Sequence, residues 1–418
     1  MPTQAVAVKN KGKYPWLIPI GFAFVEIATI ETILVQSGQF FPPVTRTLGF
    51  GIAELALWIT FYSFAMAATM PFVGRLLPLI DSRVLLTTCV LVCVLSMAAM
   101  GFYTATWQWY LSGVLIGVSG AFVFLVPGPV FINNWFAKRS GFAMGLMGFL
   151  MGVGSAIISP VCALLIQTFD WRNAYLLLAG ISLCLSLPWT LFIIRFKPEE
   201  KGMKPYGWEE GMIPIVAEHR SSPGVPVKRA LRTLPFVLLF IACGAGSLYG
   251  GFQSNWSNAA LSWGYSAMFG AMMITAGTLF KLLFPVIGWI ADRIGAYKTA
   301  YIYCAFVMLG MVGAFIHSNE VVIIISVFLF ASQSVNMKML IPLLIRETFG
   351  RRNFAKIYSY IQIGVGIIGA PAAPIVGFFY DTFGNYDGAF IYGFIVSASI
   401  LTLLIVSSFA RRKLVWEY

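Results

Sequence analysis

Apolar residues are gathered into twelve long stretches, which short polar segments separate. Each stretch is long enough to cross a hydrocarbon core of about 30 Å as an α-helix. The stretches cover residues 16–41, 52–75, 84–105, 108–133, 141–167, 173–195, 235–260, 265–290, 299–317, 320–345, 354–380 and 387–410. The pattern therefore predicts twelve transmembrane helices.

Composition agrees with a membrane location. Hydrophobic residues make up 59% of the chain, charged residues only 11%, and the mean hydropathy is +0.83. These values lie outside the usual range of soluble domains. We therefore expect a multi-pass protein of the cell membrane.

The net charge of +12 follows the expected topology. With the N-terminus inside, all but four of the 28 Lys and Arg fall in the termini and cytoplasmic loops. The exceptions are Arg46, Arg172, Lys281 and Lys338. This bias predicts that both termini are cytoplasmic, so the charge gives no reason to expect nucleic acid as a partner. The short basic N-terminal segment shows no cleavable signal and, with the composition, suggests a bacterial cytoplasmic membrane.

A charged, proline-containing segment, residues 196–234, divides the chain into two halves of six predicted helices, residues 1–195 and 235–418. Phe142 and Gly152 of the first half recur as Phe354 and Gly364 in the second. A repeated six-helix unit with a cytoplasmic linker is typical of two-bundle transporters. The sequence thus predicts an all-α polytopic membrane protein with two pseudo-symmetric six-helix bundles.

Small residues and prolines modify the predicted helices. Gly113, Gly117 and Gly120 share one face of the fourth helix, where a neighbouring helix could pack closely or slide. Prolines inside the apolar stretches should kink the helices that contain them. They are Pro127, Pro129, Pro160, Pro285, Pro371 and Pro374.

Several motifs resemble those of a known family. The segment 288–295, Gly-Trp-Ile-Ala-Asp-Arg-Ile-Gly, resembles the loop signature of the major facilitator superfamily. Within that superfamily, segments 134–141, 170–175 and 198–207 resemble the monocarboxylate porter and oxalate/formate antiporter group. The resemblance spans essentially the whole chain. It implies the major facilitator fold and secondary transport without a cofactor.

The resemblance also implies a conformational latch, in which the acidic residue of the loop interacts with a neighbouring helix terminus. The expected latch residues are Gly288, Asp292, Arg293 and Gly295, with Gly74, Asp81 and Arg83 as a degenerate counterpart in the first half. A solvated charged loop is the alternative in both halves.

Four charged residues fall inside predicted helices, namely Glu26, Glu31, Lys281 and Lys338. A charge near the bilayer centre costs roughly 2.5–3.5 kcal/mol on insertion scales, so these residues indicate a polar cavity. Organic-anion relatives carry a basic residue where this chain has Pro285, one turn from Lys281. We therefore expect Lys281 to bind a substrate carboxylate, unless a glutamate of another helix neutralises it.

Lys338 is a second candidate for substrate binding or coupling, although its long stem could instead extend to the cytoplasmic surface. Glu31, near the middle of the first helix, is expected to carry a coupling proton or to pair with Lys281. Glu26 lies on a different face and is a further candidate for these roles. Gln39, Phe40, Tyr249, Phe252 and Trp256 are polar or aromatic residues that could line the cavity.

These residues predict a secondary active transporter of an organic anion, with a carboxylate as the expected substrate, that works by alternating access with proton coupling or anion exchange. One alternative is proton-coupled efflux of a cationic or amphiphilic compound that Glu26 and Glu31 bind. Another is a non-transporting membrane sensor or scaffold with this fold. The sequence contains no Walker loop, nucleophile–base pair or metal-ligand spacing, so an enzyme, a metal site and a cofactor are not expected.

Overall fold

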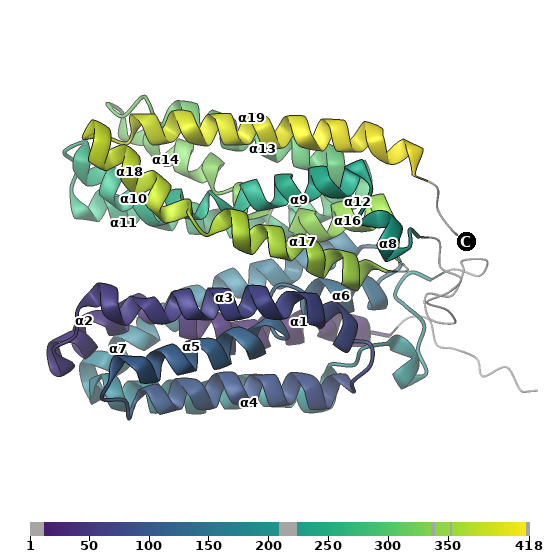
Figure 1. Ribbon diagram of the computed structural model, residues 1–418, viewed down its shortest axis with the longest axis horizontal. Helices are drawn as coiled ribbons and strands as arrows, with labels where there is room; N and C mark the ends of the chain where they lie inside the picture. The colour runs from purple at the N-terminus through teal and green to yellow at the C-terminus, as the bar shows by residue number, and fades with distance from the viewer. Residues whose placement is uncertain (1–11, 209–223, 336–338, 352, 415–418) are drawn as a thin grey trace, which may run out of the picture. The chain divides into compact units, whose positions relative to one another are not determined.

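The computed structural model describes residues 12–208, 224–335, 339–351 and 353–414 (Figure 1). The chain divides into two compact units, Met1–Ser222 and Pro223–Glu417, and the division falls within the predicted linker. Regular structure in the described residues is helical, with two isolated β-bridges and no strand. The predicted all-α class is confirmed.

Unit 1 contains seven α-helices in its described part. They are α1 (Tyr14–Glu26), α2 (Ser37–Leu48), α3 (Ile52–Leu76), α4 (Ser82–Met100), α5 (Thr106–Ala121), α6 (Pro127–Trp135) and α7 (Ser140–Pro188). Two π-helical segments, Ile27–Val35 and Trp189–Ile193, extend α1 and α7, and a 3₁₀ turn covers Pro198–Lys201.

Unit 2 is built from shorter helices. They are α8 (Val227–Ala230), α9 (Leu234–Ser247), α10 (Gly250–Ser262), α11 (Ala267–Leu279), α12 (Phe284–Ile294), α13 (Ala296–Gly313), α14 (Glu320–Phe330), α15 (Gln333–Val335), α16 (Ile341–Phe349), α17 (Phe354–Gly369), α18 (Ala372–Phe383) and α19 (Asp387–Ala410). The 3₁₀ turns Phe280–Leu283 and Arg411–Lys413 follow α11 and α19.

Eight helices in the described residues are long and apolar enough to cross a membrane. One of them, Ser140–Ile193, contains two predicted spans that meet at Asp170, where φ is 67° and ψ is 157°. The predicted spans 108–133, 320–345 and 354–380 are each divided into shorter helices. Three divided spans and one joined pair therefore account for the difference between twelve predicted spans and eight continuous ones.

Prolines coincide with three interruptions of the regular α-helix in the described residues. The gap between α5 and α6 precedes Pro127, the 3₁₀ turn between α11 and α12 precedes Pro285, and α17 ends before Pro371. A proline has no N–H to donate to the carbonyl four residues earlier. The regular hydrogen-bond pattern of the helix is therefore interrupted there. Pro160, by contrast, lies inside α7 without a break in the helix.

The first described part of the linker folds back onto unit 1. The N–H of Tyr206 donates to the carbonyl of Trp135 over 2.8 Å, and its carbonyl accepts from the N–H of Ala137 over 2.9 Å. The Tyr206 ring packs edge-on against Trp16 of α1 with 5.2 Å between centroids. This segment therefore joins the start of α1 to the α6–α7 loop.

The second described part of the linker is held by unit 2 in a comparable way. The N–H of Val225 donates to the carbonyl of Phe349 over 3.0 Å, and the Val225 carbonyl accepts from the Asn353 side chain over 3.2 Å. The α16–α17 loop corresponds to the α6–α7 loop in the predicted repeat. Both described ends of the linker thus bind corresponding loops through main-chain hydrogen bonds.

Close packing of α3 against α5 depends on the glycine face predicted from the sequence. Figure 1 shows the two helices together in unit 1. A Cβ on Gly113 would overlap the carbonyl oxygen of Trp58, and one on Gly117 would overlap that of Tyr62. The face therefore packs directly against the backbone of α3.

We expect Gly113→Ala to lower the free energy of unfolding by about 1–3 kcal/mol, because the added methyl group forces α3 and α5 apart. The measurement is thermal unfolding of the purified protein in detergent. Gly180→Ala is the matched control, since a Cβ there meets nothing within 4 Å and alanine favours helix. Equal melting temperatures for the two variants would contradict the close packing.

Candidate functional site

A cavity of about 60 Å³ lies within unit 2, at the helix breaks described above. Its lining comes from α10, α11, the 3₁₀ turn Phe280–Leu283, α14 and the start of α15. The lining residues are Trp256, Met273, Ile274, Gly277, Thr278, Lys281, Val327, Phe330, Ala331, Gln333 and Ser334. We call this cavity the Lys281 pocket. It brings together Lys281 and Trp256, two residues that the sequence predicted for the substrate cavity.

Local backbone chemistry places Lys281 in its 3₁₀ turn. Pro285 has no N–H to donate to the carbonyl of Lys281, which lies four residues earlier. The N–H of Phe284 donates to that carbonyl instead and tightens the helix to three residues per turn. The side chain of Lys281 is partly exposed and reaches the pocket from this turn.

Trp256 lines the pocket and has a buried indole N–H without an acceptor. The side chain is 3% exposed, and no acceptor among the described residues lies within hydrogen-bond distance of its Nε1. Its ring packs edge-on against Phe330, another lining residue, with 5.4 Å between centroids. Buried polar groups normally have a partner, so an unpaired donor at a cavity indicates a place for a bound acceptor.

The hydroxyl groups in the lining are already engaged as donors. Thr278 Oγ1 donates to the carbonyl of Ile274 over 3.0 Å, and Ser334 Oγ donates to that of Ala331 over 2.7 Å. Gln333, which is 7% exposed, adds an amide group. Sequence reasoning missed Gln333, because an isolated glutamine in an apolar stretch gives no periodic signal.

The remaining residues predicted for unit 2 lie at different distances from this pocket. Tyr249 is buried and shares a 2.7 Å hydrogen bond with Ser397. Phe252 packs against the lining residue Phe330 with 5.9 Å between centroids, one layer behind the cavity. Lys338 lies outside the described residues.

Unit 1 holds both intramembrane glutamates in its interior. Glu26 is 3% exposed, and a Cβ on Gly128 would lie 3.4 Å from Glu26 Oε1. Gly128 belongs to the first turn of α6, whose N-terminus lies inside the predicted fourth span, near its end. A helix N-terminus attracts a carboxylate. Glu26 therefore packs where the missing side chain of Gly128 leaves room.

Glu31 lies in the π-helical segment Ile27–Val35 and is 5% exposed. Thr32, its neighbour, donates to the carbonyl of Ile27 over 2.6 Å. Single π-helical turns are uncommon and occur often at functional sites. The sequence predicted a plain helix here, since nothing in a run of apolar and threonine residues identifies a π-helix.

Two further predicted residues of unit 1 take part in internal contacts. Gln39 Nε2 donates to Gln36 Oε1 over 2.8 Å and to Ser159 Oγ over 3.1 Å. Phe40 is 2% exposed and stacks on Tyr175 with 3.9 Å between centroids. Their contact with a substrate stays a prediction.

The degenerate loop of unit 1 makes local contacts. Gly74 is buried in α3. Asp81 caps α4 by accepting from the N–H of Arg83 over 2.8 Å, and its carboxylate also pairs with the Arg83 guanidinium. The backbone hydrogen bond from Arg83 is the main reason that the pKa of Asp81 is lowered. The predicted contact of Asp81 with another helix stays a prediction.

Beside the loop of unit 2, the carboxylate of Glu347 of α16 lies at a helix N-terminus. Glu347 Oε2 accepts from the N–H of Ala296, the first residue of α13, over 2.9 Å. Gly295 precedes it with φ of 92° and would place a Cβ 3.7 Å from both carboxylate oxygens. Gly288 is buried, and Asp292 and Arg293 are exposed.

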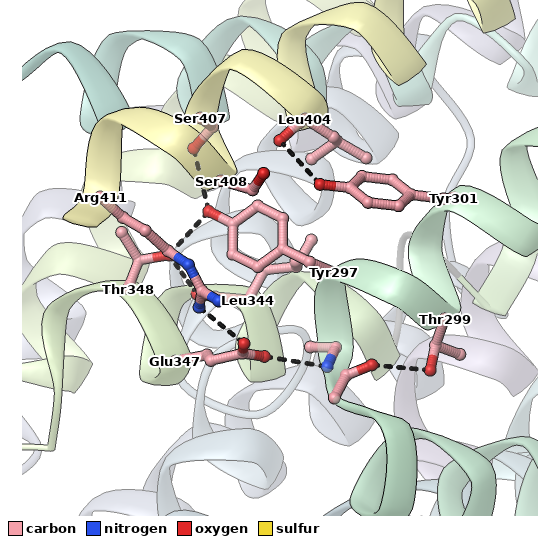
Figure 2. A network of polar contacts seen from close by, with 12 residues as sticks. Tyr297, Thr299, Tyr301, Leu344, Glu347, Thr348, Leu404, Ser407, Ser408 and Arg411 are labelled. Atoms are coloured by element: carbon pink, nitrogen blue, oxygen red, sulfur yellow. Dashed lines mark hydrogen bonds and ion pairs between the residues drawn. The ribbon is translucent and has the colours of Figure 1, made fainter.

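Figure 2 shows how Glu347 is joined to α19. Arg411 donates to Glu347 Oε1 over 2.6 Å, and its guanidinium lies 4.5 Å from the centre of the Tyr297 ring. The Tyr297 hydroxyl forms hydrogen bonds with Thr348 at 2.8 Å and Ser407 at 2.9 Å. This network ties α13, α16 and α19 together at one end of unit 2.

We expect Glu347→Ala to lower the free energy of unfolding by about 1.5–3 kcal/mol, because it removes hydrogen bonds to a charged group and leaves a helix N-terminus uncapped. Glu347→Gln should cost less, since its amide oxygen can still accept from Ala296. Thermal unfolding in detergent measures both, with the exposed Glu320→Ala as control. A loss as large in the control would show that the network does not stabilise the unit.

Comparisons with known proteins agree on one family. Residues 35–341 match the family model of the Major Facilitator Superfamily. Monocarboxylate transporter 12 of Rattus norvegicus is 25% identical over 343 residues, covering 75% of this chain and 69% of the relative. The Homo sapiens protein of the same name is 25% identical over 340 residues, covering 74% of this chain and 64% of the relative.

Solved structures share the fold at lower identity. The fucose:proton symporter of E. coli has a TM-score of 0.66 and 16% identity, covering 94% of this chain and 98% of the symporter. A proton:xylose symporter has a TM-score of 0.70 and 11% identity, covering 94% of both chains. The predicted major facilitator fold is thus confirmed. The chain belongs to the major facilitator superfamily and is a multi-pass membrane transporter rather than an enzyme.

Proposed function

We propose that the protein transports a small organic anion, and that the Lys281 pocket binds its carboxylate. One observation carries this proposal. Lys281 and Trp256, whose indole N–H is unpaired, both line the pocket, and none of its described lining residues is Asp or Glu.

The donors of the pocket favour an anion over a cation. The hydroxyl hydrogens of Thr278 and Ser334 bind main-chain carbonyls, so these groups need no acceptor from a ligand. Lys281 and Trp256 can donate to carboxylate oxygens, and a charge-assisted hydrogen bond is roughly twice as strong as a neutral one. A cationic ligand in the pocket would lie close to the positive charge of Lys281, which disfavours it.

The size of the pocket favours a small substrate group. A group the size of a water molecule occupies about 10–15 Å³ of cavity volume. The pocket, at about 60 Å³, therefore holds roughly four to six non-hydrogen atoms. The apolar lining residues Met273, Val327 and Phe330 suit a short hydrocarbon part. The similarity to monocarboxylate transporters supports the same substrate class.

Two buried carboxylates support coupling to protons or exchange of anions. Glu31 lies in a π-helical segment, a feature that is frequent at functional sites. Glu26 lies at the N-terminus of α6, where it has a favourable electrostatic role of its own. We therefore propose Glu31 as the proton carrier and Glu26 as a structural ion partner, in a transporter that works by alternating access.

We also propose the predicted domain limits, latch and membrane topology as parts of this transport cycle. The domain limits 1–195, 196–234 and 235–418 and the latch at Asp292 and Arg293 suit such a cycle. The distribution of Lys and Arg supports cytoplasmic termini.

We expect Lys281→Ala to weaken carboxylate binding about ten- to a hundredfold, because it removes a hydrogen bond to a charged group. Trp256→Phe keeps an aromatic ring but removes the N–H, and should weaken binding about two- to tenfold. The measurement is ligand-induced thermal stabilisation of the purified protein with monocarboxylates, dicarboxylates and cationic drugs.

Trp263→Phe is the matched control, since it makes the same chemical change outside the pocket lining. Unchanged carboxylate binding in Lys281→Ala would overturn the assignment of the pocket. Stabilisation by cations alone, lost in Glu31→Gln and retained in Lys281→Ala, would favour the efflux alternative.

A second prediction concerns coupling. In proteoliposomes, we expect substrate uptake by the unmodified protein to depend on an imposed pH gradient, and Glu31→Gln to remove that dependence while substrate exchange continues. Glu26→Gln is the matched control and should keep the pH dependence. An unchanged response in Glu31→Gln would show that another group carries the proton.

A further inference from the structure

A second cavity, distinct from the Lys281 pocket, lies between the start of α9 and the end of α19. It has a volume of about 450 Å³, within the range of small-molecule sites. Leu234, Val406 and Phe409 form apolar walls and are 57%, 42% and 59% exposed. We call this cavity the α9–α19 groove. Its open apolar walls suit a hydrocarbon chain.

Positive charge borders one end of the groove. Lys413 belongs to its lining, and the Arg412 guanidinium lies 5.3 Å from the centre of the Phe409 ring. The neighbouring Arg411 differs, because it is paired with Glu347 at 2.6 Å. None of the described residues that line the groove is acidic. The groove therefore combines an apolar trough with a cationic end.

This combination matches the chemistry of an anionic phospholipid. The acyl chain of such a lipid is apolar, and its phosphate carries the negative charge that Lys413 and Arg412 can bind. Basic pockets between transmembrane helices are known to favour anionic lipid headgroups. We propose that the α9–α19 groove binds one anionic phospholipid, with an acyl chain against Leu234, Val406 and Phe409 and the phosphate at Lys413.

Arg411, which belongs to the network in Figure 2, directly precedes Arg412 and Lys413 in the chain. Arg411 joins α19 to Glu347, and the next two residues of the chain hold the lipid phosphate. Lipid binding would thus order the end of α19 beside the ion pair. We expect the thermal stability of unit 2 to rise with the bound lipid, since a ligand that binds only the folded state stabilises it.

Native mass spectrometry of the full-length protein in neutral detergent tests the proposal. The probes are phosphatidylglycerol, phosphatidylcholine with the same acyl chains, and soluble glycerol phosphate. We expect one phosphatidylglycerol to bind more tightly than phosphatidylcholine, and Lys413→Ala to weaken that binding about fivefold. Lys298→Ala, an exposed lysine outside the groove lining, is the matched control and should leave it unchanged.

A second variant tests the apolar part of the site. Ala410 lines the groove, so Ala410→Trp should fill it and reduce binding of phosphatidylglycerol while all the basic residues remain. Equal binding of the two phospholipids, or full binding by Ala410→Trp, would overturn the proposal. Binding of glycerol phosphate as tight as that of phosphatidylglycerol would assign the site to a free anion instead of a lipid.

Discussion

The hydrocarbon core of a membrane supplies no hydrogen-bond partners, and this constraint determines where the chain can depart from a helix. An unpaired main-chain group in that environment costs several kcal/mol, so a break is tolerated only where protein covers it or a polar cavity receives it. Three breaks in the described residues meet this condition. The α5–α6 gap lies beside the buried Glu26, the turn before α12 carries Lys281, and the turn after α14 leads to Gln333.

Prolines determine where these helix breaks, and the polar side chains beside them, are located. Pro285 leaves the carbonyl of Lys281 without its usual partner, and the 3₁₀ turn that results carries the side chain to the pocket. Pro127 and Pro129 likewise allow α6 to start inside a span, and Gly128 between them leaves space for a carboxylate. The same residues that end a helix thus create the polar positions that a transporter needs.

Much of this architecture could be predicted from the sequence, because it depends on local properties. Long apolar stretches predicted the helices, and prolines predicted the positions of three helix breaks. The glycine face of α5 was visible as a period of about four residues. The contacts of Glu347 with Ala296 and Arg411 were not predictable, since they join residues 51 and 64 positions apart. The π-helix at Glu31 and the unpaired Trp256 N–H also depend on packing that no local pattern encodes.

The two units show which properties of the repeat are free to differ. Each unit has a break in the corresponding span, between α5 and α6 in unit 1 and between α14 and α16 in unit 2. The two units therefore share this interruption of the backbone helix. The charges beside the breaks are opposite, with Glu26 in unit 1 and Lys281 in unit 2. A break supplies a cavity and unpaired main-chain groups whatever side chain occupies it. One backbone arrangement can therefore position an acidic side chain in one unit and a basic side chain in the other.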